Sequence, residues 1–252
     1  MDLFNLTGKK AIITGASRGL GFGAAEGLLE AGAEAVLIGS SEKVKEAARQ
    51  FCGRGLKAHA VQADLSVKEQ LQTGFEKALE ILDGRLDILI QAAGVQRRHK
   101  AEEFLLSDWE LVLNVNLTAV FELCQLAGRI MLSQGSGKII NFASMLSYFG
   151  GYTVPAYAAS KGGVAQLTKA LSNEWAKYGI NINAIAPGYM ATEMNIRLLQ
   201  DEERNASILS RIPAGRWGTA EDIKGTAVFL ASQASDYLNG AVVPVDGGYL
   251  GC

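Results

Sequence analysis

The sequence predicts an α/β fold in which one doubly wound, parallel, seven-stranded sheet forms a single domain over residues 1–252. Seven short apolar runs recur along the chain, and segments with apolar residues every three or four positions separate them. No Pro- or Ser-rich linker, internal repeat or low-complexity tract divides the 252 residues. Strands that alternate with helices form right-handed βαβ units, which place the strands parallel in one sheet.

Most of the expected strands are continuous apolar runs, as in strands that are buried on both faces. They cover residues 10–14, 35–38, 57–62, 87–91, 138–142, 181–185 and 241–245. Helical spacing follows the first strand and recurs in 71–82, in 107–132, where Ser107 and Asp108 are expected to cap the helix, and in 155–178. Ligands bind beyond the carboxyl ends of the strands in such sheets, so the residues after each strand are the candidate site.

Composition limits the classes of partner and the location. The net charge of −2 offers no electrostatic footprint for nucleic acid or an anionic membrane, and no segment approaches 18 uninterrupted apolar residues. The first residues lack the pattern of a signal peptide. Three widely separated cysteines suit free thiols in a reducing cytoplasm, and the two histidines lack metal-ligand spacing. We therefore expect a cytoplasmic protein that binds a small molecule and no metal.

A glycine-rich turn follows the first expected strand. Residues 14–21 read Thr-Gly-Ala-Ser-Arg-Gly-Leu-Gly, and a helical pattern comes next. Glycines permit a tight turn and the close approach of a pyrophosphate, whose oxygens bind the free N–H groups of the helix start. A plain strand-to-helix turn is the alternative, but the position after the first strand favours a dinucleotide. The cofactor-binding residues expected here are Gly15, Ser17, Arg18, Gly19, Leu20 and Gly21.

The residues after the second strand leave the form of the dinucleotide open. A carboxylate at this place would accept the ribose 2′-OH and select NAD. The chain has Gly39, Ser40 and Ser41 instead, and the first acid is Glu42. Ser40 is a candidate cofactor contact. Arg18 and Lys43 could face the 2′-phosphate of NADP, or they could be solvated surface charges.

Two further strand ends supply candidate cofactor contacts. Asp64 and Leu65 follow the third strand, where the carboxylate could reach the adenine amino group or could cap the next helix. Ala93 and Gly94 follow the fourth strand, and small residues there would let a cofactor lie close to the backbone.

Tyr157 and Lys161 are four residues apart in an expected helix, so they project from one face. A neighbouring ammonium favours the phenolate and would lower the pKa of the tyrosine. The tyrosine could then take an alcohol proton as hydride leaves to a cofactor, or return it in reduction. A surface Tyr–Lys contact is the alternative.

Two polar residues complete the candidate catalytic group. Ser144 lies just past the fifth strand, where its hydroxyl could bind the substrate oxygen or could merely form a turn. Asn116 lies inside the helical stretch 107–132 and could order a water next to Lys161, although a local bond to the helix backbone is the commoner use of such a residue.

Taken together, these motifs resemble the short-chain dehydrogenase/reductase family over nearly the whole chain. The resemblance rests on residues 14–21, Asp64-Leu65, Ala93-Gly94, Asn116, Ser144, Tyr157-x-x-x-Lys161 and Pro187-Gly188. It implies a Rossmann-type oxidoreductase, a tetrad of Asn116, Ser144, Tyr157 and Lys161, and a homotetramer. It also implies that Tyr157, Lys161, Pro187, Gly188 and Thr192 contact the cofactor. Gln91 and Ala92 stand where the family has two asparagines, which puts a strand-stabilising side-chain bond in doubt.

Five further blocks resemble the 2-deoxy-D-gluconate 3-dehydrogenase group, which also acts as 2-dehydro-3-deoxy-D-gluconate 5-dehydrogenase. They are residues 94–98, 143–147, 173–177, 184–192 and 212–218. This implies a secondary alcohol and ketone interconverted on a sugar acid, with NAD favoured and NADP tolerated. A gluconate 5-dehydrogenase, a 3-oxoacyl-carrier-protein reductase and a non-catalytic dinucleotide-binding protein are the alternatives.

A sugar acid carries a carboxylate that the site must recognise. Arg97 and Arg98 follow Gly94 in the loop beyond the fourth strand, and a guanidinium there can bind a carboxylate through two hydrogen bonds. Adjacent side chains in a loop diverge, so we expect one of the two to face the substrate, beside Ser144 and Tyr157. A pair of solvated loop charges is the alternative.

Overall fold

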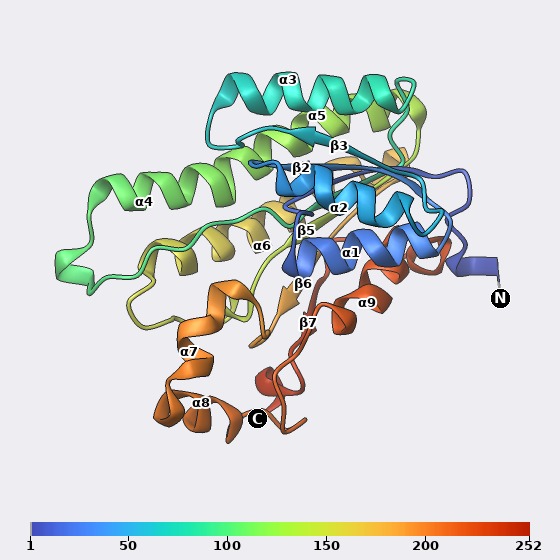
Figure 1. Cartoon of the computed structure of the whole chain (residues 1–252). Helices are drawn as coiled ribbons and strands as arrows, with labels where there is room; N and C mark the ends of the chain where they lie inside the picture. The colour runs from blue at the N-terminus through green and yellow to red at the C-terminus, as the bar shows by residue number, and fades with distance from the viewer. Residues whose placement is uncertain (1) are drawn as a thin grey trace.

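A computed structural model describes residues 2–252 and contains a seven-stranded parallel sheet in the order β3-β2-β1-β4-β5-β6-β7 (Figure 1). Every neighbouring pair of strands is parallel. The predicted doubly wound α/β fold is confirmed, and each strand overlaps one expected run. The strands are β1 (Lys10–Thr14), β2 (Glu34–Gly39), β3 (Ala58–Gln62), β4 (Ile88–Gln91), β5 (Gly137–Phe142), β6 (Ile180–Pro187) and β7 (Val242–Val245).

Helices cover both faces of the sheet. One apolar core joins it to α1 (Gly19–Glu30), α2 (Lys43–Cys52) and α9 (Glu221–Ala231). A second core on the other face joins it to α3 (Lys68–Ile81), α5 (Ala119–Gln134) and α6 (Pro155–Trp175). Figure 1 shows α3 and α5 above the sheet and α1 and α9 below it. Strands buried on both faces explain the continuous apolar runs of the sequence.

Three short helices lie toward the carboxyl ends of the strands. They are α4 (Leu106–Leu113), α7 (Ile196–Gln200) and α8 (Glu202–Leu209). Of these, α4 packs on α6. Figure 1 shows α7 and α8 set apart from the sheet, with the C-terminus beside α8. These segments therefore border the edge at which a ligand is expected.

The stretch expected as one helix over 107–132 forms two helices, α4 and α5, and the first of them begins at Leu106. The first helical residue is Leu106, its cap position is Leu105, and no side chain caps it, so the expected Ser107-Asp108 cap is wrong. Asp108 instead accepts hydrogen bonds from the loop after β4. A π-helical turn, Asn114–Thr118, separates α4 from α5.

The stretch Leu106–Gln134 is long and apolar enough to cross a membrane by composition alone, with a mean hydropathy of 1.4 over one window. Half of that window is buried inside the protein, where α5 packs on the sheet. Core helices of globular proteins share this property, so the stretch is weak support for a membrane span.

Gln91 makes the strand-stabilising side-chain bond that the family's asparagines would make at the end of β4. Its amide nitrogen donates to Asn141 Oδ1 on β5 at 3.1 Å and to the Val120 carbonyl on α5 at 3.2 Å. It also lies 3.0 Å from the sulfur of Cys124, whose pKa burial raises to about 12. The bond between the strands is therefore retained, and the thiol stays protonated.

Candidate active site

The glycine-rich turn after β1 packs closely against the residues that follow β4. Gly15 has φ +67°, and a Cβ there would lie 2.5 Å from the backbone nitrogen of Ala93. A Cβ on Gly21 would overlap the carbonyl of Gly15. Glycine is therefore required at both places. Arg18 occupies the cap position of α1 without a side-chain cap bond, which leaves the first N–H groups of the helix for another acceptor.

The segment after β6 reaches the same turn. Pro187 ends β6, and a Cβ on Gly188 would lie 2.6 Å from the Cα of Asp246. Further along, the methyl group of Thr192 lies 3.7 Å from the position that a Cβ on Gly19 would take. The structure thus brings together the residues expected from the first and sixth strand ends. These backbone approaches and the uncapped helix start suit a dinucleotide phosphate.

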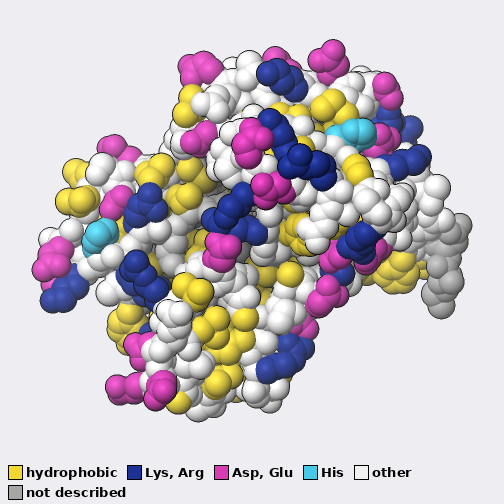
Figure 2. Space-filling view, in the orientation of Figure 1, with side chains coloured by type: hydrophobic (Ala, Val, Ile, Leu, Met, Phe, Trp, Pro, Cys, Tyr) yellow, Lys and Arg dark blue, Asp and Glu magenta, His cyan; other side chains and the backbone are white. Residues whose placement is uncertain are grey.

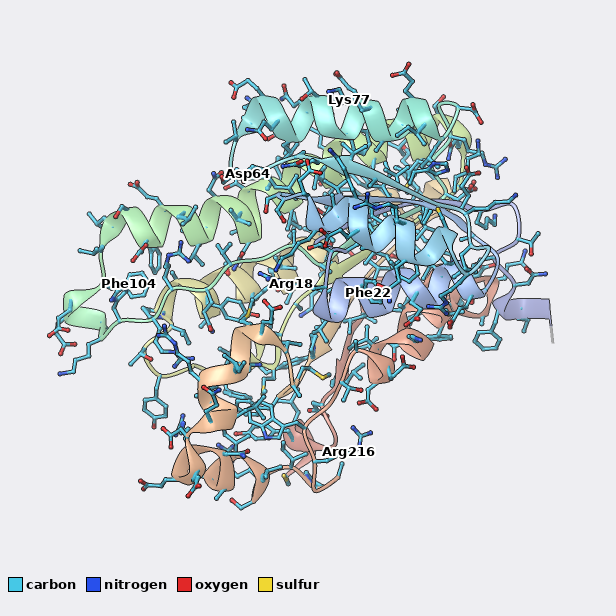
Figure 3. All side chains as sticks on the ribbon, in the orientation of Figure 1. Arg18, Phe22, Asp64, Lys77, Phe104 and Arg216 are labelled. Atoms are coloured by element: carbon cyan, nitrogen blue, oxygen red, sulfur yellow. The ribbon has the colours of Figure 1, made fainter. Side chains whose placement is uncertain are left out.

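The residues expected near an adenosine lie at the ends of β2 and β3. A Cβ on Gly39 would lie 3.6 Å from the Cβ of Ser17, so the glycine turn adjoins the end of β2. The Ser40 carbonyl accepts a hydrogen bond from Gln62. Asp64 Oδ1 accepts from the backbone and the hydroxyl of Ser66, at 2.9 and 2.7 Å. Figure 3 labels Asp64 at this edge of the sheet.

Asp64 does not cap the following helix. The first residue of α3 is Lys68, and its cap position has no side-chain bond. The carboxylate instead closes a local turn onto Ser66, ahead of the first helical residue. Leu65 packs against the core on the α3 side of the sheet.

Tyr157 and Lys161 lie on one face at the start of α6, as the spacing predicts. The Lys161 ammonium is buried, with 4% exposure, and donates to the Phe142 carbonyl at the end of β5 at 2.6 Å. It lies 5.7 Å from the centre of the Tyr157 ring. Ser144 hydrogen bonds with the tyrosine side chain. The fifth strand end and α6 therefore form one polar group beside the glycine turn.

The pKa of Tyr157 moves in the direction opposite to the expectation. Burial raises it above its usual value, and the hydrogen bond with Ser144 offsets only part of that rise. Burial also lowers the pKa of Lys161, to about 8. In the chain alone, desolvation outweighs the attraction between the ammonium and a phenolate.

Asn116 bonds to a loop distant in sequence and makes no bond to its own helix, so the expected local bond is wrong. Its Oδ1 accepts from the Val95 amide at 2.8 Å, and its Nδ2 donates to the Val95 carbonyl at 2.9 Å and to Ser160 Oγ at 3.2 Å. A Cβ on Gly94 would lie 3.3 Å from Asn116 Oδ1 and 3.9 Å from Lys161 Nζ. The π-helical turn thus fixes the loop after β4 against the buried lysine.

Arg97 and Arg98 point to different partners. The Arg97 guanidinium forms an ion pair with Asp108 on α4, at 3.1 Å. Arg98 donates to Thr153 Oγ1 at 3.0 Å and to the Tyr152 carbonyl at 3.3 Å, in the loop that leads into α6. Burial and the nearby Arg204 lower the pKa of Arg98. Of the two, Arg98 is the arginine directed toward the start of the helix that carries Tyr157.

Known proteins resemble the chain over its whole length. A family model described as enoyl-(acyl carrier protein) reductase matches residues 15–250. The 2-dehydro-3-deoxy-D-gluconate 5-dehydrogenase of Bacillus subtilis is 50% identical, with 99% of this chain and 97% of the relative covered. The chain belongs to the short-chain dehydrogenase/reductase family. Among other relatives, the gluconate 5-dehydrogenase of Gluconobacter oxydans is 44% identical over 98% of this chain and 96% of its own.

Solved structures of the short-chain dehydrogenase/reductase family superpose closely. A gluconate 5-dehydrogenase from Burkholderia cenocepacia, in complex with NADP and tartrate, has a TM-score of 0.95 and 41% identity, covering 100% of this chain and 98% of its own. A protein from Agrobacterium tumefaciens, provisionally described as a 2-deoxy-D-gluconate 3-dehydrogenase with bound NADP, has a TM-score of 0.92 and 46% identity over the whole of both chains.

The sequence analysis did not identify Arg204, or the small core around α8, as part of the candidate site. Arg204, on α8, is close enough to lower the pKa of Arg98, and within residues 2–252 neither arginine has an ion-pair partner. Five buried side chains hold this region together: Met145, Ile208, Ile212, Trp217 and Tyr249. Tyr189 packs edge-on against Trp217 and Tyr249. The charged run 201–204 reads as a solvated helix face, so no local signal points to the site.

Proposed function

We propose that the chain is a nicotinamide-dependent oxidoreductase that interconverts a secondary alcohol and a ketone on a sugar acid, with 2-deoxy-D-gluconate or 2-dehydro-3-deoxy-D-gluconate as its substrate. The observation that carries the proposal is the convergence of Ser144, Tyr157 and Lys161 beside the uncapped start of α1. The relatives at 47–50% identity named 2-dehydro-3-deoxy-D-gluconate 5-dehydrogenase support the substrate class.

We assign the catalytic steps to four residues. When bound, the nicotinamide accepts or donates the hydride of the reacting carbon. The Tyr157 phenolate takes the proton from the alcohol in oxidation, and the Tyr157 phenol donates it to the ketone oxygen in reduction. Ser144 holds the same oxygen by a hydrogen bond and stabilises the charge that develops on it. The ammonium of Lys161 stabilises the phenolate of Tyr157 while the proton is away, and Asn116 holds the loop that packs against Lys161.

A dinucleotide would bind along the glycine-rich turn and the uncapped start of α1. Its phosphates would lie against the N–H groups at the start of α1, and Ser40, Asp64 and Leu65 would lie beside the adenosine. The nicotinamide would lie among Tyr157, Lys161 and Thr192. The full set proposed to hold it is Gly15, Ser17, Arg18, Gly19, Leu20, Gly21, Ser40, Asp64, Leu65, Ala93, Gly94, Tyr157, Lys161, Pro187, Gly188 and Thr192.

We infer that the site accepts NADP as well as NAD. No carboxylate stands at the end of β2, where Gly39 is followed by two serines, so a 2′-phosphate meets no fixed negative charge there. The solved relatives with NADP bound support this, and they give no support to the preference for NAD that the sequence suggested.

We assign the substrate carboxylate to Arg98. Its guanidinium lacks an acidic partner among residues 2–252, and the positive charge of Arg204, also without an ion-pair partner there, lowers its pKa. Two neighbouring guanidinium groups repel each other until an anion lies between them, so they favour a carboxylate ligand. Arg97 is engaged by Asp108 and has no part in this assignment.

We propose further that the chain acts as a homotetramer in the cytoplasm. The apolar side chains of Leu106 and Phe121, on α4 and α5, are 77% and 45% exposed within the part of the chain that the structure describes. Leu171, an alternative contact on α6, is 6% exposed and belongs to the core. The three cysteines are free thiols, which suits a reducing compartment.

A spectrophotometric screen tests the function. Purified protein is mixed with hexonates and ketohexonates and with each nicotinamide cofactor, and absorbance at the reduced nicotinamide band is followed. Turnover of 2-deoxy-D-gluconate or of 2-dehydro-3-deoxy-D-gluconate supports the proposal. Turnover of gluconate alone would instead favour a gluconate 5-dehydrogenase, the activity named for a 44% identical relative. Binding of the cofactor without turnover of any compound would favour the non-catalytic alternative.

A further inference from the structure

An ion pair joins the two segments that border the dinucleotide site. Arg18 lies in the glycine-rich turn, and its guanidinium contacts the carboxylate of Glu193, which directly follows Thr192 after β6. Both side chains are more than half exposed, at 57% and 64%. Figure 3 labels Arg18 near the middle of the carboxyl edge, and Figure 2 shows basic and acidic side chains touching there.

The neighbourhood holds two cations that a 2′-phosphate could meet. Arg18 follows Ser17, which adjoins the end of β2, and Lys43 begins α2 shortly after that strand. Lys43 has no ion-pair partner among residues 2–252, and the nearby Glu42 pairs with Lys45. Only one of these two cations is therefore already engaged, and its partner is Glu193.

We propose that Glu193 sets the preference of this chain between NAD and NADP by competing with the 2′-phosphate for Arg18. The proposal rests on the proposed function, since it requires that a nicotinamide dinucleotide binds at the glycine-rich turn. It gives Glu193 a role in cofactor selection although the residue lies on the segment after β6, distant in sequence from the strand end that usually selects the cofactor.

The competition follows from what each cofactor offers to Arg18. A 2′-phosphate accepts charge-assisted hydrogen bonds from a guanidinium, and Arg18 must leave Glu193 to donate them. NAD has a hydroxyl at this position, so the ion pair persists when NAD binds. A ligand shifts an equilibrium only by its differential interaction with the two states. The ion pair therefore weakens NADP binding by its own free energy and leaves NAD binding unchanged.

Glu193→Gln tests the competition by direct binding. Calorimetric titration of NAD⁺ and NADP⁺ gives a Kd for each, independently of turnover. An exposed ion pair changes an equilibrium constant by up to about fivefold. We therefore expect the variant to bind NADP⁺ about three- to fivefold more tightly than the wild type, with the Kd of NAD⁺ changed by less than about twofold. Equal tightening of both cofactors, or no change in their ratio, overturns the proposal.

The double variant separates competition from a general loss of negative charge. In an Arg18→Gln background no ion pair exists, so adding Glu193→Gln should leave the ratio of the two Kd values unchanged. If the second substitution still tightens NADP⁺ binding in that background, Glu193 acts through long-range repulsion and the proposal fails. Glu42→Gln is the matched control, because it removes a nearby carboxylate without touching Arg18, and an equal effect there also contradicts the proposal.

The outcomes also separate this proposal from the function on which it rests. If wild-type protein binds neither dinucleotide, the proposed function fails and the role of Glu193 fails with it. If both dinucleotides bind and Glu193→Gln leaves their ratio unchanged, only the role of Glu193 fails. Measuring at low and high ionic strength adds a check, because the gain from Glu193→Gln should shrink as salt screens the exposed pair.

Discussion

At the scale of single residues, Tyr157 carries the sharpest prediction. The Tyr157→Phe variant keeps the ring that fills the site and removes only the transferable proton and the bond with Ser144. We expect turnover to fall by about a hundredfold or more, because general acid–base catalysis of this kind contributes about 10²–10⁴-fold. The Kd of the dinucleotide should stay within about twofold. Steady-state kinetics and calorimetry check both, and near wild-type turnover would reject the assignment.

Arg98 and Arg97 form a matched pair for the substrate carboxylate. Arg98→Ala should raise the KM for the sugar acid by about ten- to a hundredfold, because a charged hydrogen bond contributes about 1.5–3 kcal/mol. Arg97→Ala removes a neighbouring arginine whose partner is Asp108, so its KM should stay near that of the wild type. Equal effects of the two variants, or none in either, would show that the carboxylate binds elsewhere.

The site residues differ in how far the sequence could predict them. The glycine turn and the Tyr157–Lys161 spacing are local patterns, so the sequence contains them in full. The partner of Asn116 is Val95, 21 residues away, and Arg204, whose charge acts on Arg98, lies on α8, far from Arg98 in the sequence. Contacts of this kind depend on tertiary packing and leave no periodic signal in the chain. The pKa of Tyr157 was also mispredicted, because burial is a property of the fold.

At the scale of elements, the strands were predictable and the helix ends were not. The inner parallel strands are buried on both faces, which produces continuous apolar runs such as 12–13 and 88–90. Ser107-Asp108 looked like a cap, but α4 begins at Leu106 and Asp108 serves the loop after β4. A sequence offers many polar residues that could cap a helix, and the tertiary contacts of each residue decide which one caps it in the folded chain.

The start of α6 should make stability depend on pH. Lys161 has a pKa of about 8 in the folded chain, against 10.5 as its ordinary value. Between these values the unfolded chain holds the proton and the folded chain does not, so stability rises with pH across this window. We expect the free energy of unfolding of the wild type, relative to that of Lys161→Met, to rise on the order of 1–2 kcal/mol between pH 8 and 9.5.

Urea unfolding of both proteins at several pH values measures this gain. Lys161→Met serves as the reference because it lacks the titrating group while other groups titrate equally in both proteins. The raised pKa of Tyr157 acts in the opposite direction, but only as the pH passes the ordinary value of 10.0 for tyrosine. A difference between the two proteins that stays constant from pH 8 to 9.5 would contradict a depressed pKa at Lys161.

At the scale of the whole molecule, the site at the carboxyl edge of the sheet is formed by segments that are distant from one another in the sequence. The glycine turn, the π-helical turn, the start of α6 and the segment after β6 come from distant parts of the sequence and meet at one edge (Figure 1). The aromatic residues Tyr189, Trp217 and Tyr249 tie α8 and the C-terminal turn to this edge. The alternation of strands and helices predicted the edge, whereas the small core beneath α8 follows no periodic pattern.

The exposed apolar surface of α4 and α5 makes assembly testable. Phe121 is 45% exposed on a helix whose other face is in the core, and Leu106, at the start of α4, is 77% exposed. We expect light scattering at micromolar concentration to give four times the 26.8 kDa chain mass for the wild type. Phe121→Glu should give a smaller species, because a buried charge without a partner opposes association.

Phe4→Glu is the matched control for this experiment. Phe4 is 43% exposed, close to the value for Phe121, but it lies in the N-terminal turn Asp2–Phe4, at the end of the molecule opposite α4 (Figure 1). An added charge there should leave the mass unchanged, so a smaller species from this variant would mean that any surface charge disrupts the assembly. A monomer mass for the wild-type protein would reject the tetramer outright, and the exposed leucine and phenylalanine would then need another partner.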